Sequence, residues 1–156
     1  MTRPSTDEHA QMIAANKAAV LRAGGEVWSK GDLDVVDELC TPDYVCHFVV
    51  GLEWRGREGI REQVRSHRTS FPDWHEQVDD IVAEGDRVAI RFTSTGTHLG
   101  EFSGIPPTGK KASIREIAIH RMVDGMIAEQ WGMPDQLGLM QQLGEGQAGA
   151  GQGGDS

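Results

Sequence analysis

Three polar side chains stand in segments whose other residues are mostly apolar, and they are the first candidates for chemistry. They are His47, Arg91 and Glu116. Each one alone fits a solvated sheet face, or a buried group with an ordinary hydrogen-bond partner. Several of them on the inner face of one sheet would instead indicate a cavity, because a filled core buries apolar side chains there. Desolvation in such a cavity would move the pKa of Glu116 towards the range that acid–base catalysis uses.

The segment 116–144 contains the pattern that must position Glu116. Its turn, Val123-Asp124-Gly125-Met126, predicts a two-residue type I′ hairpin, since Asp-Gly accepts the positive φ angles of that turn. The turn fixes the register, and alternation then groups the side chains by face. In the first strand the faces are Glu116, Ala118 and His120 against Ile117, Ile119 and Arg121. In the second they are Ala128, Gln130 and Gly132 against Ile127, Glu129 and Trp131.

Helical patterns fill the first half of the chain, and strand patterns dominate the second. Apolar spacing predicts helices over 7–30, 32–39 and 57–69, with a short helical segment over 137–143. Strands are predicted over 44–50, 75–84, 87–97, 111–123 and 126–133, with a loop over 51–56. This order predicts one α+β domain over 7–144, in which N-terminal helices cover a curved antiparallel sheet. The segments 1–6 and 145–156 are expected to be flexible tails.

Composition excludes several classes of partner. The 156 residues carry a formal net charge of −9, which argues against binding to nucleic acid or to an anionic membrane surface. No apolar run approaches the roughly 20 residues of a membrane helix, and the first residues do not have the pattern of a signal peptide. We therefore expect a cytoplasmic protein without membrane contact. Cys40 and Cys46 are then expected to be reduced thiols.

Conventional cofactor and metal motifs are missing or out of context. Gly144, Gly146 and Gly149 spell GxGxxG, but no strand precedes them and no helix follows to present its N-terminus to a phosphate. The histidines do not show HxH or HExxH spacing, and the two cysteines have no histidine pair to complete a tetrahedral zinc site. We therefore expect neither a metal nor a cofactor.

Several segments carry a resemblance to a known family. They are Gly96–Phe102, Gly104–Lys110, Arg121–Gly125 and Asp135–Gly144, with Trp28–Leu33, Tyr44 and His47 upstream. In their order and spacing the chain resembles the SnoaL-like polyketide cyclases, also called ester cyclases, of the nuclear-transport-factor-2-like superfamily. The resemblance implies a cone-shaped fold in which helices and a bent sheet enclose a deep apolar pocket. It also implies a homo-oligomer, a dimer or a tetramer, since the opposite sheet face often meets a second subunit.

The resemblance also implies which hairpin face points inward. In the family's aldol cyclases an aspartate of the last strand acts as acid and base on an aromatic polyketide ester, without metal or cofactor. That aspartate falls at Gly132 here, and a pocket histidine falls at Ala118. Glu116 falls at a pocket glutamine, and Asp135 at an acidic position near the rim. Gln130 and Gly132 would then point inward and Trp131 outward.

Because Gly132 cannot transfer a proton, another group must supply a contribution that is typically about 10²- to 10⁴-fold. Glu116 is the preferred acid or base, with His98 and Asp135 as further catalytic candidates. The residues expected to contact a small hydrophobic substrate are Tyr44, His47, Arg91, Ala118, His120, Gln130 and Gly132. His47 and Arg91 could also relay a proton or stabilise an oxyanion. For His120, a structural role as an aromatic side chain at the strand's end is the alternative.

Three functions fit these residues. The first is a cofactor-independent enzyme that cyclises or isomerises a hydrophobic polyketide-like or polycyclic intermediate by acid–base chemistry. The second keeps the pocket and changes the reaction, to a cofactor-free hydroxylation or an epoxide opening in secondary metabolism. The third is a non-catalytic, dimeric module that binds a small molecule, which the missing aspartate and histidine would allow.

Overall fold

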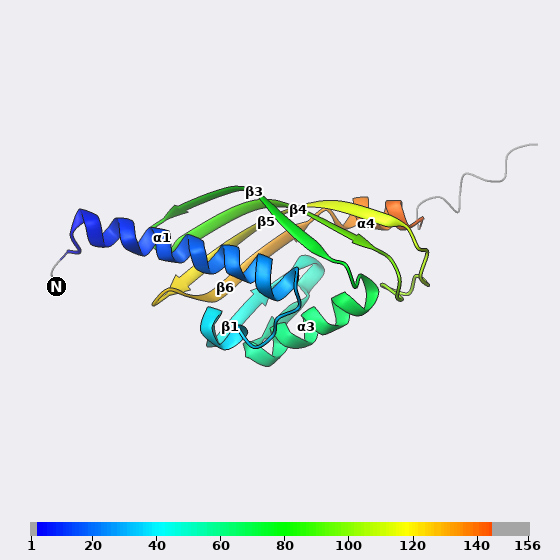
Figure 1. The fold of residues 1–156 in the computed structure, drawn as a ribbon, viewed down its shortest axis with the longest axis horizontal. Helices are drawn as coiled ribbons and strands as arrows, with labels where there is room; N and C mark the ends of the chain where they lie inside the picture. Colours follow the sequence, from blue (N-terminus) through cyan, green and yellow to red (C-terminus); the bar gives the residue numbers. More distant parts are fainter. Residues whose placement is uncertain (1–2, 145–156) are drawn as a thin grey trace, which may run out of the picture.

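The computed structural model describes residues 3–144 and shows an α+β fold built on a curved, open sheet (Figure 1). The six strands lie in the order β2-β1-β6-β5-β4-β3. They are β1 (Cys40–His47), β2 (Glu53–Arg55), β3 (His75–Glu84), β4 (Arg87–Thr97), β5 (Lys111–Val123) and β6 (Met126–Pro134). The helices are α1 (Thr6–Arg22), the π-helix η1 (Ala23–Trp28), α2 (Val36–Leu39), the 3-10 helix η2 (Val49–Gly51), α3 (Gly56–Ser70) and α4 (Gln136–Leu143). The predicted fold class is confirmed, with α1 and α3 on one side of the sheet.

Two features of the sheet differ from the prediction. β1 runs parallel to β6, whereas the other neighbouring strands are antiparallel, so the sheet is mixed. The predicted loop 51–56 contains β2, which pairs with β1 at Val45↔Arg55. The sequence pattern of β1 predicts a strand but does not indicate which strands pair with it.

The predicted helix over 7–30 is divided into two helices. Ser5 caps α1 through a capping box with Glu8, and the α-helix ends at Arg22. The chain then continues as η1, which contains Gly24 and Gly25. A Cβ atom on Gly24 would lie 3.1 Å from Oε2 of Glu76. The missing side chain at Gly24 therefore lets η1 approach the Glu76 side chain of β3 closely.

The hairpin of β5 and β6 has the predicted turn and, over most of its length, the predicted faces. Asp124 and Gly125 have φ angles of 51° and 77°, which fits a type I′ turn. A bulge at Arg121/Met122 interrupts the register. It brings Ile127, which the alternation placed on the outer face, opposite Met122 and into the core. The assignment of Ile127 was therefore wrong, because one extra residue reverses the faces beyond it.

The buried apolar side chains form two clusters. The larger one joins α1, η1 and α3 to β1 and the middle of the sheet, and the smaller one surrounds Phe71 and Trp74 with α4. No helix among residues 3–144 is long and apolar enough to cross a membrane. The predicted tail 145–156 lies outside the described residues.

Candidate functional site

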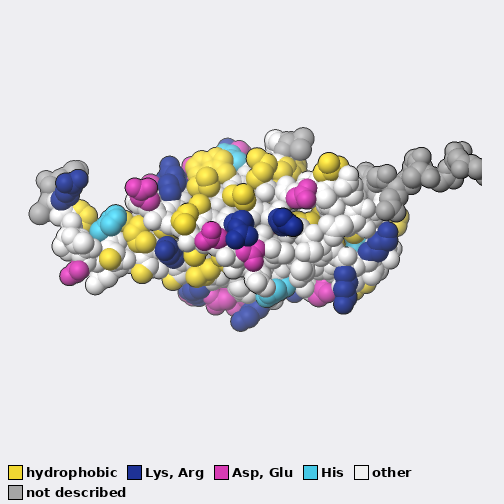
Figure 2. All heavy atoms as spheres, turned by 90° about the horizontal axis from the view of Figure 1, so that it is seen from above, with side chains coloured by type: hydrophobic (Ala, Val, Ile, Leu, Met, Phe, Trp, Pro, Cys, Tyr) yellow, Lys and Arg dark blue, Asp and Glu magenta, His cyan; other side chains and the backbone are white. Residues whose placement is uncertain are grey.

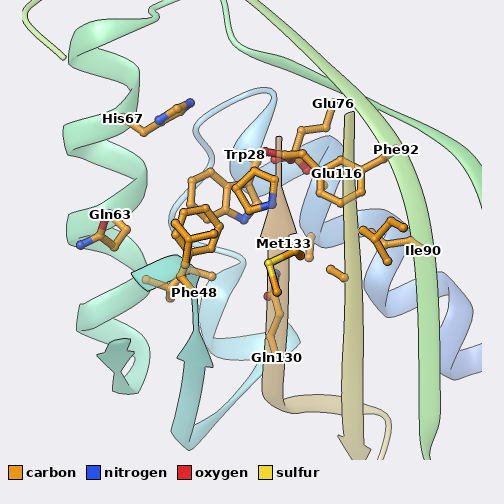
Figure 3. A pocket seen from close by; sticks show the side chains of 18 of the residues that line it. Trp28, Phe48, Gln63, His67, Glu76, Ile90, Phe92, Glu116, Gln130 and Met133 are labelled. Atoms are coloured by element: carbon orange, nitrogen blue, oxygen red, sulfur yellow. The ribbon is translucent and has the colours of Figure 1, made fainter. Parts of the chain in front are cut away.

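A cavity of about 230 Å³ lies between the concave face of the sheet and the helices α1, η1 and α3 (Figure 3). Its wall is mainly apolar, and its aromatic members include Trp28, Tyr44, Phe48, Trp54, Trp74 and Phe92. Leu52 and Met133 also line it and are 58% and 68% exposed, so the cavity opens to solvent on their side. An apolar cavity with few polar groups is typical of a small-molecule site.

Glu116 projects into this cavity from β5, as the sequence predicted. Its residue is only 9% exposed, and Oγ of Ser94 donates a hydrogen bond to its Oε2 over 3.1 Å. Burial raises the pKa of the Glu116 carboxyl to about 7, and the bond from Ser94 opposes this rise. Near neutral pH the carboxyl can therefore exist in both protonation states, as an acid–base catalyst requires.

A second carboxyl group lines the cavity, and the sequence analysis missed it. Glu76 of β3 lies opposite Ser94 of β4, and Nε1 of Trp74 donates to its Oε1 over 3.4 Å. Burial raises the pKa of Glu76 well above the ordinary value, and the charge of Glu116 raises it further. Glu76 is two residues before Val78, and this spacing could have placed it on the inner face of β3. The neighbouring acidic residues of β3 obscured that pattern.

The floor of the cavity holds an amide and a hydroxyl group. The hydroxyl of Tyr44 donates to Oε1 of Gln130 over 3.0 Å, and both residues line the cavity as predicted. Because Tyr44 occupies the amide oxygen, the amide nitrogen of Gln130 remains to donate to a ligand. Burial also raises the pKa of the Tyr44 hydroxyl well above its ordinary value, so Tyr44 stays neutral.

Two histidines line the cavity as neutral groups. His120 donates from Nδ1 to the carbonyl oxygen of Val88 over 3.4 Å, and burial lowers its pKa to about 4. His67 of α3, which the sequence analysis did not select, lies in an aromatic cluster with its ring 4.2 Å from that of Trp74. Burial lowers the pKa of His67 to about 4 as well. Neither imidazole carries a charge at neutral pH that would balance the two carboxyl groups.

Ala118 and Gly132 face each other across β5 and β6, and both line the cavity as predicted. A Cβ atom on Gly132 would lie 3.1 Å from Cδ2 of Phe48. The Phe48 ring therefore occupies the space that a longer side chain at position 132 would enter.

His47 and Arg91 were predicted to contact a substrate, but the structure places neither of them in the cavity wall. His47 lies on the outer face, where it bonds to Glu53 and Glu129 and stacks on Trp131. Its neighbours Tyr44 and Cys46 are the inward residues of β1, and alternation sends His47 outward. Arg91 is exposed on the outer face of β4, 3.8 Å from a carboxylate oxygen of Asp79.

His98 and Asp135, the other catalytic candidates, also lie outside the cavity wall. His98 is fully buried beyond the end of β4, where its Nδ1 bonds to Thr108 and its ring packs on Phe71. Asp135 caps α4 by accepting from the backbone N–H of Gly138 over 2.9 Å. Both residues therefore have structural partners that their sequence context did not reveal.

The cavity wall offers oxygen and nitrogen atoms to an organic ligand rather than to a metal. Within residues 3–144 no three His, Cys, Asp or Glu side chains form a group that could hold a metal ion. Among these described residues no lysine or arginine lines the cavity either. An aromatic ligand with neutral oxygen substituents fits this wall best, because the rings can stack on it while Gln130 donates to an oxygen.

Known proteins share this fold and much of this sequence. The family model for SnoaL-like polyketide cyclases matches residues 18–143. The aklanonic acid methyl ester cyclase DnrD of Streptomyces peucetius is 30% identical over 123 residues, which cover 77% of this chain and 85% of DnrD.

Solved structures agree with this match. IdmH from Streptomyces antibioticus, provisionally described as a polyketide cyclase, is 34% identical, with a TM-score of 0.74 over 83% of this chain and 98% of IdmH. AclR from Streptomyces galilaeus, provisionally described as a hydroxylase, is 33% identical, with a TM-score of 0.74 over 85% of this chain and 98% of AclR. The chain belongs to the SnoaL-like polyketide cyclase family.

Proposed function

We propose that this protein is a cofactor-independent enzyme that closes a ring in a hydrophobic polyketide-type ester, with Glu116 as the general base. The observation that carries the proposal is the Glu116 carboxyl, which is buried in an apolar cavity and has its pKa raised to about 7. The curated relative DnrD is named for a cyclisation of this class. In an aldol ring closure the catalyst has to supply only proton transfers, because the new C–C bond forms between two carbons of the substrate. Acidic and basic side chains are therefore sufficient catalysts.

The positions of the polar groups support this reaction. The ionised Glu116 would remove a proton from the carbon next to a substrate carbonyl. The amide nitrogen of Gln130, with its oxygen held by Tyr44, would donate to an oxygen of the substrate. The aromatic wall would hold a planar ring system and exclude water from the enolate.

The direct test is turnover of polyketide methyl esters, with aklanonic acid methyl ester as the first member of the panel. The expected product has the mass of the substrate and a different chromatographic retention, because an aldol ring closure keeps all atoms. Tight binding without an isomeric product from any member would contradict the proposal and favour the non-catalytic module.

We expect the enzyme to prefer methyl esters to the corresponding free acids. In the described part of the chain no lysine or arginine lines the cavity, whereas Glu76 and Glu116 do, so a substrate carboxylate would lose its hydration without gaining a counter-charge. Binding of the acid at pH 8 should be at least about tenfold weaker than that of the ester, which corresponds to about 1.4 kcal/mol. Titration calorimetry of a matched ester–acid pair measures this ratio, and equal affinities would contradict the charge argument.

Hydroxylation of a similar substrate is the second candidate, because AclR is 33% identical to this chain. Oxygen consumption coupled to a product heavier by one oxygen atom would support it. An isomeric product without oxygen uptake would reject it.

We also propose that the outer face of the sheet binds a second copy of the chain. Large apolar side chains are exposed there, among them Val82, Ile117, Ile119 and Trp131. Figure 2, which views the molecule from above, shows hydrophobic side chains gathered between charged ones. Light scattering after size-exclusion chromatography tests this: Ile119→Asp should shift the population towards the monomer, and a monomeric wild type would contradict the proposal.

A further inference from the structure

Glu76 and Glu116 reach the same part of the cavity from strands on the two sides of β4. Glu76 lies opposite Ser94, and Glu116 lies opposite Phe92, so the two glutamates flank β4 on its inner face and are offset by two residues along it. Figure 3 shows both side chains at the upper wall of the cavity. Ser94, which donates to Glu116, stands between them.

No side chain among the cavity-lining residues that the structure describes carries a positive charge to balance two carboxylates. The other titratable groups that line it are His67, His120, Tyr44 and Cys40, and burial disfavours the charged form of each. Two carboxylates without a cation in an apolar site cannot both ionise easily, so one of them retains a proton. Aspartic proteases use such a pair, in which one carboxyl acts as base and the other as acid.

We propose that Glu76 is a second catalytic residue of this site and acts as the general acid that complements Glu116. The proposal rests on the proposed function and deepens it, because it explains how the site works with Gly132 and Ala118 at the two family positions. The acid–base pair is on β3 and β5, and β6 contributes only the amide donor Gln130.

The proposed step balances in atoms and electrons. Glu116 takes the proton from the carbon next to a carbonyl, and the C–H electron pair forms the enolate. The enolate carbon bonds to a second carbonyl carbon of the same molecule, whose π electrons move to its oxygen, and that oxygen takes the proton of Glu76. A proton transfer from Glu116 to Glu76 then restores the pair.

The assignment of the two roles follows from their surroundings. Burial raises the pKa of both carboxyls, and the charge of Glu116 raises the pKa of Glu76 further. Glu116 therefore ionises first and Glu76 keeps the proton. The rate should rise with pH as Glu116 ionises, and should fall at higher pH as Glu76 loses its proton.

Glutamate-to-glutamine variants test the pair without requiring a substrate. In ¹³C-carboxyl NMR titrations the wild type should show two raised carboxyl pKa values, and Glu116→Gln should lower that of Glu76. Glu84→Gln, an exposed glutamate at the end of the same strand, is the matched control and should change neither value. A Glu76 carboxyl that is already ionised at neutral pH, or whose pKa is unchanged in Glu116→Gln, would overturn the proposal.

Kinetics separate catalysis from a structural role. Glu76→Gln should lower kcat by about 10²-fold or more at pH 7 and remove the fall in rate at alkaline pH. An equal loss at every pH, with the alkaline fall retained, would overturn the catalytic role.

Coupled titrations without turnover of any ester would reject the proposed function but retain the proton-sharing pair. Turnover with uncoupled titrations would retain the function and overturn the role of Glu76.

A pair of glycine variants in η1 offers a second test that leaves both carboxyls in place. Alanine at Gly24 would put its Cβ atom 3.1 Å from Oε2 of Glu76, whereas alanine at Gly25 would meet no atom within 4 Å. Both changes have the same effect on helix propensity. Gly24→Ala should shift the Glu76 titration and lower turnover, and Gly25→Ala should do neither; equal effects of the two variants would count against the proposal.

Discussion

Replacing Glu116 by glutamine should lower kcat/KM for the cyclised ester by about 10²- to 10⁴-fold, the range typical of a positioned acid–base group. Glutamine has nearly the same shape and can still bond to Ser94, but it cannot accept the substrate proton. Because the neutral carboxyl and the amide are similar in size and polarity, the fold and the binding of the ester should change little. Steady-state rates for wild type and variant measure the effect.

The pH profile adds a second criterion for Glu116. In the wild type the rate should rise with pH around the Glu116 pKa of about 7, and the variant should lack this rise. Glu84→Gln makes the same chemical change at an exposed site and should leave the profile unchanged. Equal rates for wild type and Glu116→Gln would remove Glu116 from the mechanism and would require another group to act as the base.

Local patterns predicted the hairpin and the strands β3 to β6 closely. The turn at Asp124-Gly125 needs positive φ angles that few other dipeptides accept, and alternation marks the buried residues of β4 and β5. The parallel pairing of β1 with β6 could not be predicted in this way, because it joins segments that are distant in the sequence and have no turn between them. The bulge at Arg121/Met122 also has no residue signature of its own.

The site was harder to predict than the fold. Glu116 was visible because it is a charged residue on the inner side of an apolar strand. Glu76 was not, because β3 is an edge strand with several exposed acidic residues, and only the approach of η1 covers one of them. His98 and Asp135 looked reactive by residue type, but hydrogen bonds to Thr108 and Gly138 give them structural roles.

The resemblance predicted the position of the pocket correctly, and Gly132 and Ala118 line it at the positions of the family aspartate and histidine. Phe48 packs against Gly132, so the space of the family aspartate is filled by an aromatic ring. An aspartate at position 132 would have to displace that ring, which makes a return to the family chemistry by one substitution unfavourable. Gly132, Glu76 and Glu116 line the same cavity, so the proposed acid–base pair would act from β3 and β5 instead of β6.

Glu116→Gln should also make the protein more stable at alkaline pH. Folding raises the pKa of Glu116 from 4.5 to about 7, so the folded state binds more protons than the unfolded state between these values. The free energy of unfolding therefore falls as pH rises through this window. At about 1.4 kcal/mol per pKa unit, the ionised carboxyl costs the folded protein about 3 kcal/mol at pH 8, and glutamine removes this cost.

The difference between variant and wild type isolates this effect. Folding lowers the pKa of His67 and of His120, which makes their contributions rise with pH in both proteins and cancel in the comparison. Glu116→Gln should also lower the pKa of Glu76, which increases the gain of the variant at alkaline pH. Urea unfolding at about pH 4 and pH 8 should show a stability gain of the variant that is small at the lower pH and grows by at least about 3 kcal/mol at the higher one. A gain that is equal at both pH values would show that Glu116 is not held in a desolvated site. A buried reactive carboxyl reduces the free energy of unfolding at neutral pH. This is the pattern expected of a catalytic residue, since functional sites often reduce stability for the sake of activity.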